Sequence, residues 1–84
     1  MKTITVRYFA SIREAIGQGS ESVQTAAATL GALRDELIAR GGPHATHLAR
    51  GRAVRMALNQ TLSDEAAVLE EGAEVAFFPP VTGG

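Results

Sequence analysis

Eighty-four residues are enough for one small domain, and a chain of this length buries only about 60% of the surface that it exposes when unfolded. The composition, 45% hydrophobic and 20% charged, is that of an ordinary globular protein. The net charge of −1 argues against a general attraction to nucleic acid or to an anionic membrane. The absence of cysteine excludes disulfides, a thiolate zinc site and a cysteine nucleophile.

No apolar run in the sequence reaches the roughly 20 residues that span a membrane. Residues 2–6 have the pattern of a strand and not that of a signal peptide, so we expect a cytoplasmic protein. Lys2 is the only lysine, and the other seven of the eight basic residues are arginine.

The first 25 residues predict a strand, a short helix and a second strand. Residues 2–9 alternate as in a half-buried strand, and Phe9 breaks the alternation, which places it on the second face. Ser11 followed by Glu14 is a capping-box pattern that predicts one or two helical turns ending at Gly17. Residues 21–25 predict a short strand, close enough in sequence to pair with the first.

The main helix is predicted after Thr29, a good N-cap residue, because leucines follow it at helical spacing. Residues 41–43, Gly-Gly-Pro, end this helix, and residues 44–52 are expected to form a loop with about one turn. Residues 54–58 alternate as a strand that ends at residues 59–60. A turn at residues 70–72 precedes a last strand over residues 74–78, which Pro79 and Pro80 terminate because proline has no N–H for the ladder.

This order of elements predicts an α+β fold in which a sheet of about four to five strands packs on one main helix. The first and last strands are the most apolar, so we expect them at the centre of the sheet. The arrangement is the β-grasp plan, with residues 1–80 as the domain and residues 81–84 as a C-terminal tail. Periodicity alone does not give the order of the strands.

The last eight residues carry the most specific motif of the sequence: Phe77-Phe78-Pro79-Pro80-Val81-Thr82-Gly83-Gly84. This string resembles the C-terminus of the molybdopterin synthase small subunits, a ubiquitin-like family of sulfur carriers. Four further segments resemble the same family, namely residues 8–14, 29–34, 57–60 and 71–76. The resemblance covers almost the whole chain except residues 40–53 and 61–68.

The resemblance implies a cycle with two partners. An ATP-dependent, E1-like activating enzyme adenylates the carboxylate of Gly84, and sulfur then replaces one oxygen to give a thiocarboxylate. The tail next enters the large catalytic subunit of molybdopterin synthase and donates sulfur to cyclic pyranopterin monophosphate. The family forms heterotetramers of two small and two large subunits. By this resemblance the chain is not catalytic alone and binds no cofactor or metal itself.

The residue types of the tail suit this chemistry. Gly83 and Gly84 lack a Cβ, so they can pass through a narrow channel, and Pro79 and Pro80 hold the base of the tail extended. The sequence has no phosphate-binding loop that ends in Lys-Ser/Thr and no cysteine to relay sulfur, so partners must supply catalysis. The residues expected to contact partners are Phe9, Phe77, Phe78, Pro79, Pro80, Val81 and Thr82.

Several side chains have a simpler alternative role. Phe77 and Phe78 are adjacent, so they face opposite sides of the strand, and one of them is expected in the core. His44 and His47 are expected to be surface residues and not metal ligands. A set of arginines forms either a patch for an acidic partner or, more simply, a solvated face: Arg7, Arg13, Arg50, Arg52 and Arg55.

Three rival functions share these features. The chain could carry sulfur for another product, such as the thiazole of thiamine or a thiolated tRNA base. It could be a protein modifier that is conjugated through Gly84 to lysines. It could also be a β-grasp interaction module with an idle tail, in which case deletion of Gly84 would change nothing.

Overall fold

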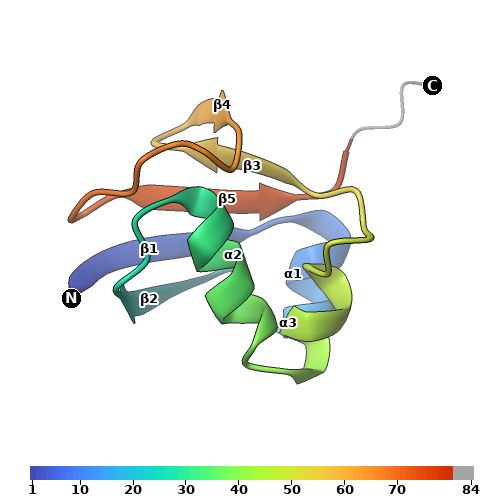
Figure 1. Ribbon diagram of the computed structural model, residues 1–84. Helices are drawn as coiled ribbons and strands as arrows, with labels where there is room; N and C mark the ends of the chain where they lie inside the picture. The colour runs from blue at the N-terminus through green and yellow to red at the C-terminus, as the bar shows by residue number, and fades with distance from the viewer. Residues whose placement is uncertain (81–84) are drawn as a thin grey trace.

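The computed structural model describes residues 1–80, which form a five-stranded sheet with three short helices (Figure 1). The sheet order is β2-β1-β5-β3-β4, so β5 is the central strand. The elements in chain order are β1 (Lys2–Tyr8), α1 (Ala10–Ile16), β2 (Ser20–Thr25), α2 (Leu30–Ile38), α3 (Gly42–His47), β3 (Arg55–Leu58), β4 (Thr61–Ser63) and β5 (Glu74–Phe78).

The two most apolar strands lie side by side, as the sequence predicts. β1 and β5 run parallel, with Thr5 opposite Glu74 and Tyr8 opposite Phe77, whereas every other strand pair is antiparallel. Parallel strands need a long crossover connection, and here it contains all the other elements. The carboxyl ends of β1 and β5, the first and last strands of residues 1–80, therefore lie next to each other at one end of the sheet.

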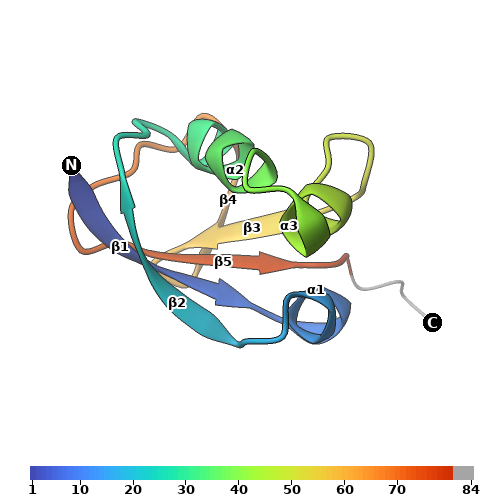
Figure 2. The same cartoon turned by 90° about the horizontal axis from the view of Figure 1, so that it is seen from below.

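Helix α2 crosses one face of the sheet, and no helix of residues 1–80 covers the opposite face (Figures 1 and 2). The Thr29 side chain caps the helix by accepting a hydrogen bond of 3.2 Å from the backbone N–H of Ala32, as predicted. Alternate side chains of the sheet meet the apolar face of α2 and form one core. Its members include Ile4, Val6, Tyr8, Leu30, Leu33, Leu37, Val75 and Phe77.

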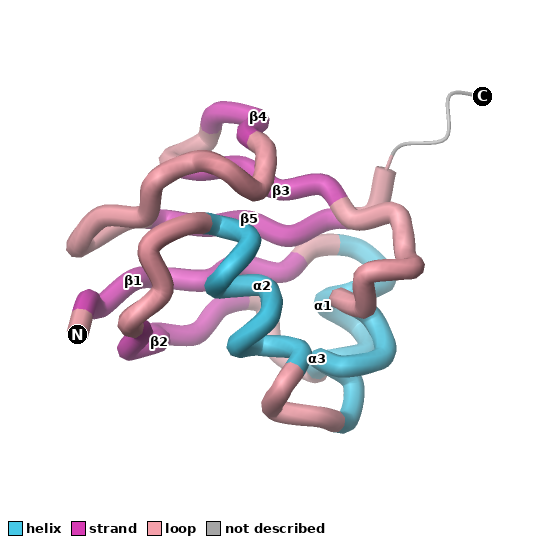
Figure 3. Tube along the Cα trace, in the orientation of Figure 1, coloured by secondary structure: helices cyan, strands magenta, loops and turns pink. Residues whose placement is uncertain are grey.

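The segment between β4 and β5 runs along the start of α2, where Figure 3 shows it in pink beside the cyan helix. Leu30 and Gly31 donate backbone hydrogen bonds to the carbonyl groups of Ala67 and Glu65, both at 3.0 Å. These bonds satisfy two of the N–H groups that the first turn of a helix leaves without an intrahelical partner.

Three local predictions differ from the structure. The capping box at Ser11 is wrong, because α1 begins at Ala10 directly after the extended Phe9, whose side chain makes no capping bond. Residues 42–47 form helix α3 where a loop was expected, with Pro43 in its first turn. Strand β4 was not predicted; it pairs with β3 through a two-residue turn in which Asn59 and Gln60 have φ values of 50° and 70°.

Two other local predictions are confirmed. Gly17 ends α1 in the left-handed conformation, with φ of 90°. The turn before β5 also contains a left-handed glycine, Gly72, with φ of 80°.

Across residues 1–80, none of the helices has the length and the apolar character needed to cross a membrane.

Candidate functional site

The base of the C-terminal tail leaves the sheet at the end of its central strand (Figure 1). Phe78, Pro79 and Pro80 are each half-buried there. The backbone N–H of Phe9 donates a 3.2 Å hydrogen bond to the carbonyl of Phe77, which ties the end of β1 to the start of the tail. The remaining predicted tail residues, Val81, Thr82, Gly83 and Gly84, lie outside the described residues.

The two adjacent phenylalanines have different roles. Phe77 is fully buried in the core and stacks on Tyr8, with ring centroids 6.4 Å apart. Its inclusion among the partner-contacting residues is therefore wrong, because its side chain lies on the helix-covered face of β5. Phe78 lies on the opposite, open face, so Phe78 is the phenylalanine of this pair that can contact a partner.

Phe78 and Phe9 line one shallow groove of about 440 Å³ on the open face of the sheet. We call it the aromatic groove; its lining residues are Arg7, Phe9, Ala57, Gln60, Glu74, Ala76 and Phe78. Ala57 and Ala76 lie opposite each other on β3 and β5, and their small side chains leave the floor low between larger neighbours.

One wall of the aromatic groove is a charged and aromatic cluster. The guanidinium carbon of Arg7 lies 5.2 Å from the centroid of the Phe9 ring, within the range of a cation–π interaction. Arg7 also lies 3.7 Å from the carboxylate of Glu74. The Phe9 side chain is 38% exposed, so a large apolar surface remains open to a partner beside the tail.

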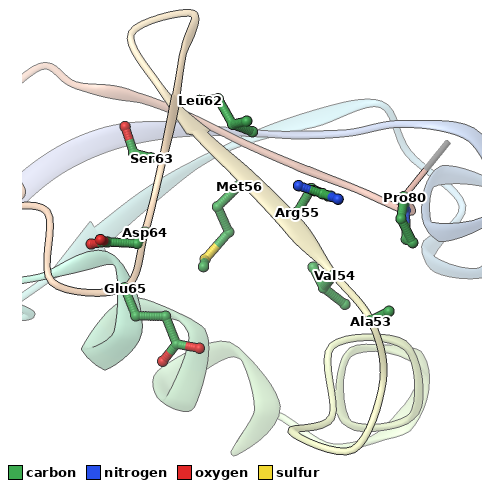
Figure 4. A pocket seen from close by; sticks show the side chains of 9 residues that line it. All are labelled: Ala53, Val54, Arg55, Met56, Leu62, Ser63, Asp64, Glu65 and Pro80. Carbon is green, nitrogen blue, oxygen red and sulfur yellow. The ribbon is translucent and has the colours of Figure 1, made fainter.

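A second groove, of about 630 Å³, lies beside Pro80 (Figure 4). Its side chains come from β3, from β4 and from the segments next to them, and include Arg55, Met56, Leu62, Asp64 and Glu65. Leu62 is 61% exposed, and no sequence pattern singles it out because β4 itself was not predicted. The base of the tail thus has open apolar surface in both grooves.

A buried arginine positions one rim of this second groove. Arg34 of α2 donates hydrogen bonds to the carbonyl groups of Leu48 (2.7 Å), Ala49 (2.8 Å) and Arg52 (3.3 Å). It also binds the carboxylate of Glu65 at 3.2 Å. Because Arg34 is 4% exposed, these bonds form out of contact with water and hold the irregular segment that leads to Ala53 and Val54.

A polar cluster joins β1 and β2 to helix α3 and to Arg40, which follows α2. Tyr8 Oη donates a 2.7 Å hydrogen bond to Glu21 Oε2, and His44 Nε2 lies 3.3 Å from Tyr8 Oη and 3.4 Å from Glu21 Oε2. Arg40 Nη1 donates to Glu21 Oε1 at 3.1 Å. The prediction that His44 is a surface residue is wrong, because it is only 8% exposed and packs edge-on against the Tyr8 ring.

This cluster changes the acidity of two of its members. Burial of Glu21 acts to raise its pKa, but the hydrogen bonds from Tyr8 and Arg40 outweigh burial and hold the pKa below its usual value. Burial and the adjacent Glu21 carboxylate both raise the pKa of Tyr8 above its usual range, so Tyr8 stays neutral and keeps donating. The cluster is therefore a stable link between elements.

The arginines do not form one free basic patch. Arg50 pairs with Asp35 at 2.9 Å and with Glu65, and the hydrogen bonds to these two carboxylates raise its pKa. Arg7 is shared between Phe9 and Glu74, as described above. Within residues 1–80, no three His, Cys, Asp or Glu side chains are grouped so that they could hold a metal ion.

The mixed sheet with its parallel β1–β5 pair and the helix across one face define a ubiquitin-like β-grasp protein, which confirms the predicted fold. The ThiS family model matches residues 6–84. This chain belongs to the ThiS family, and the match includes the four tail residues beyond the described structure.

Proteins similar to this chain have names that agree with the resemblance seen in the sequence. It is 42% identical to the molybdopterin synthase sulfur carrier subunit of Escherichia coli and 40% identical to that of Haemophilus influenzae, each over 96% of this chain and 99% of the relative. A solved complex of subunits 1 and 2 of the molybdopterin-converting factor from Helicobacter pylori contains a similar chain, with a TM-score of 0.69, 26% identity and coverage of 98% and 99%.

Proposed function

We propose that this chain is the sulfur carrier subunit of molybdopterin synthase and acts in the cytoplasm. The observation that carries the proposal is the similarity over nearly full length to sulfur carrier subunits, at 40% and 42% identity. The geometry supports it, because Phe78 and Pro80, at the end of the central strand, line two grooves with apolar walls that can receive a partner.

In the proposed cycle, a carboxylate oxygen of Gly84 attacks the α-phosphate of ATP in an E1-like enzyme, and pyrophosphate leaves. Sulfur at the oxidation level of hydrosulfide then attacks the acyl carbon, AMP leaves, and loss of the proton from sulfur gives a thiocarboxylate on Gly84. The thiocarboxylate donates its sulfur to cyclic pyranopterin monophosphate in the large subunit. This chain binds no cofactor in the cycle, since ATP is held by the activating enzyme.

Docking is assigned to the open surface around the base of the tail. Phe9 and Phe78 are aromatic anchors of the type that dominates the binding energy of protein interfaces. Pro79 and Pro80 restrict the backbone next to these anchors, which lowers the entropy lost when the tail is ordered on binding. The partner that we propose for this surface is the large subunit, by analogy with the Helicobacter pylori complex of subunits 1 and 2.

The decisive experiment is intact mass spectrometry of the protein isolated from its own cells, with fragmentation of the C-terminal peptide. The expected result is a mass gain equal to the replacement of one oxygen by sulfur, located at Gly84. An unmodified Gly84 in cells that are making molybdopterin would contradict the proposal. Adducts of Gly84 with lysines of other proteins would instead identify a protein modifier.

Two variants test the role of the tail in a reconstituted synthase. Deletion of Gly84 should abolish sulfur transfer and leave the unfolding temperature unchanged, because the core lies within residues 1–80. Gly83→Trp should block entry into the active-site channel of the large subunit. Transfer to a different acceptor, such as a thiazole precursor or tRNA, with no transfer to the pyranopterin would reassign the pathway.

A further inference from the structure

Strand β2 forms one edge of the sheet and is open to a further strand. It pairs with β1 alone among residues 1–80, and Figure 1 shows it at the edge opposite β4. β4 has three residues, whereas β2 has six and runs in continuous register with β1. Proteins commonly protect a long edge with lysine, proline or a bulge, and β2 has none of these. β2 is therefore the edge of this sheet that can accept a strand of ordinary length.

The ladder between β1 and β2 determines which backbone groups of β2 point outward. The N–H of Tyr8 donates a 2.9 Å hydrogen bond to the carbonyl of Gly19, the residue directly opposite. Hydrogen-bonded and non-hydrogen-bonded pairs alternate along an antiparallel ladder, so the N–H and C=O groups of Ser20, Ser22 and Gln24 point away from β1. An added strand can bond to these groups without disturbing the existing sheet.

A groove of about 350 Å³ lies between this edge and helix α2. Its lining residues are Glu21, Ser22, Val23, Gln24, Glu36, Leu37 and Arg40. Val23 and Leu37 belong to the apolar side of the groove, where they pack against the core. A strand added to β2 would direct alternate side chains into this groove. None of the lining residues lines either groove at the base of the tail, so this surface is a separate one.

The groove contains a carboxylate without a cationic partner. Glu36 is exposed and accepts a 2.5 Å hydrogen bond from Thr25 Oγ1, but within residues 1–80 it forms no ion pair. The second carboxylate of the groove, Glu21, is bound by Arg40 at 3.1 Å. Lys2 lies opposite Thr25, but its Nζ donates to a backbone carbonyl. The charge that would complement this groove is therefore positive.

We propose that the groove between β2 and α2 binds an extended segment of another protein, which joins the sheet as a further strand beside β2. The segment directs an apolar side chain onto Val23 and Leu37 and a lysine or arginine toward Glu36. Its backbone hydrogen bonds to β2 supply affinity, and the two side chains supply specificity. This site is additional to the docking surface of the proposed function, with which it shares no lining residue.

A second copy of this chain does not have the required pattern. Two-fold pairing of two β2 strands that joins their outward groups places Ser22 opposite Ser22 of the second copy. The same register places Glu21 opposite Val23 of the second copy, so a carboxylate meets an apolar side chain. β2 also has no basic residue to offer to Glu36. A basic and apolar segment of a different protein meets both requirements.

The test is an NMR titration of the isotope-labelled whole chain with the blocked peptide Ser-Val-Thr-Lys-Thr-Val-Ser. We expect saturable shifts of backbone amides in residues 20–24 and 36–40. Replacement of the peptide lysine by norleucine should weaken binding by about threefold, the size expected of a partly exposed ion pair. Glu36→Gln should bind both peptides equally. Glu70→Gln, at an exposed site elsewhere, is the matched control and should keep the threefold difference of about this size.

Gln24→Pro tests the backbone bonds, because proline removes an outward N–H and edge strands tolerate it. It should weaken binding at least about tenfold, whereas Gln24→Ala should bind as the original chain does. If Gln24→Pro unfolds, the Glu36→Gln comparison decides alone. Unchanged binding by a folded Gln24→Pro, no saturable shift at millimolar peptide, or shifts confined to the aromatic groove would overturn the proposal. Shifts of residues 20–24 that grow with protein concentration without peptide would overturn it in favour of a second copy.

Discussion

At the scale of single residues, Gly31 shows how closely the segment after β4 packs on helix α2. A Cβ at this position would lie 2.9 Å from Oε1, 3.0 Å from Cβ and 3.3 Å from the carbonyl oxygen of Glu65. The same glycine donates its N–H to Glu65 and accepts a hydrogen bond from Arg50. The close contact of helix and segment requires a residue without a side chain here.

Gly31→Ala is therefore expected to destabilise the protein, although alanine normally stabilises a helix by ~0.8–1.0 kcal/mol relative to glycine. We expect a loss of about 1–2 kcal/mol, because Glu65 and its backbone must move. Urea unfolding measures the change. Gly51→Ala is the control, since a Cβ at Gly51 meets nothing within 4 Å. A stabilised Gly31→Ala variant would contradict the packing argument.

Glu21 links stability to acid pH through its lowered pKa. A carboxylate whose pKa is lower in the folded than in the unfolded state stabilises the protein above the unfolded value, here 4.5, and loses this effect as the pH falls through the folded value. Glu21→Gln should cost about 1–2 kcal/mol at neutral pH, where the original carboxylate accepts bonds from Tyr8 and Arg40.

The difference between Glu21→Gln and the original chain should shrink as the pH falls below the unfolded value of 4.5 and then through the lowered pKa of Glu21, because the carboxylate of the original chain is then protonated. Thermal unfolding of both proteins at about five pH values between roughly pH 3 and pH 7 measures this difference in stability. Glu70→Gln, at an exposed site, should show no such convergence. A constant difference at all pH values would show that Glu21 stabilises the fold through its shape and not its charge.

At the scale of elements, the short helix α3 and the short strand β4 depend on tertiary contacts that cannot be recognised from their own sequences. Helix α3 has only six residues and no apolar periodicity, and it is held by the burial of His44 and by the contact of His44 with Tyr8. Strand β4 has three residues, and Leu62 faces solvent. Sequence pattern failed at both because tertiary contacts, and not local propensity, stabilise such elements.

Arg34 is the element-scale contact with the largest expected effect. Arg34→Met removes the donor to three carbonyl groups and the partner of Glu65, so we expect a loss of about 2–4 kcal/mol. Amide hydrogen exchange should rise in residues 48–54, which these bonds hold. Arg52→Met is the control, because the Arg52 side chain is exposed and its substitution should stay within about 0.5 kcal/mol. Unchanged exchange in residues 48–54 would show that the Arg34 hydrogen bonds do not hold this segment.

At the scale of the whole molecule, the aromatic groove should decide partner binding without deciding stability. Phe9→Ser with Phe78→Ser should weaken binding to the large subunit by roughly 30-fold or more, as expected for the loss of about 2 kcal/mol at an interface anchor. Titration calorimetry with the purified large subunit measures this loss. Val68→Ser removes an apolar side chain that is more exposed than Phe9, at 65%, from the segment before β5 and should not change the affinity.

The fold as a whole was predictable from a few strong patterns. The alternation in β1 and β5 and the leucines after Thr29 give the two buried surfaces that pack together, and the apolar character of β1 and β5 places them centrally. The tail motif is the basis for proposing Gly84 as the reactive end. By contrast, the grooves depend on which strands are neighbours, so the meeting of Phe9 with Phe78 and the exposure of Leu62 could not follow from periodicity.

The central position of β5 has a consequence for how the protein is made. Among the strands of residues 1–80 it is the last to leave the ribosome, yet it is the strand that joins the β1–β2 pair to the β3–β4 pair. Without residues 74–78, the β1–β2 pair and the β3–β4 pair have no strand between them. Closure of the five-stranded sheet therefore waits for residues 74–78, because β5 alone pairs with both β1 and β3 among residues 1–80.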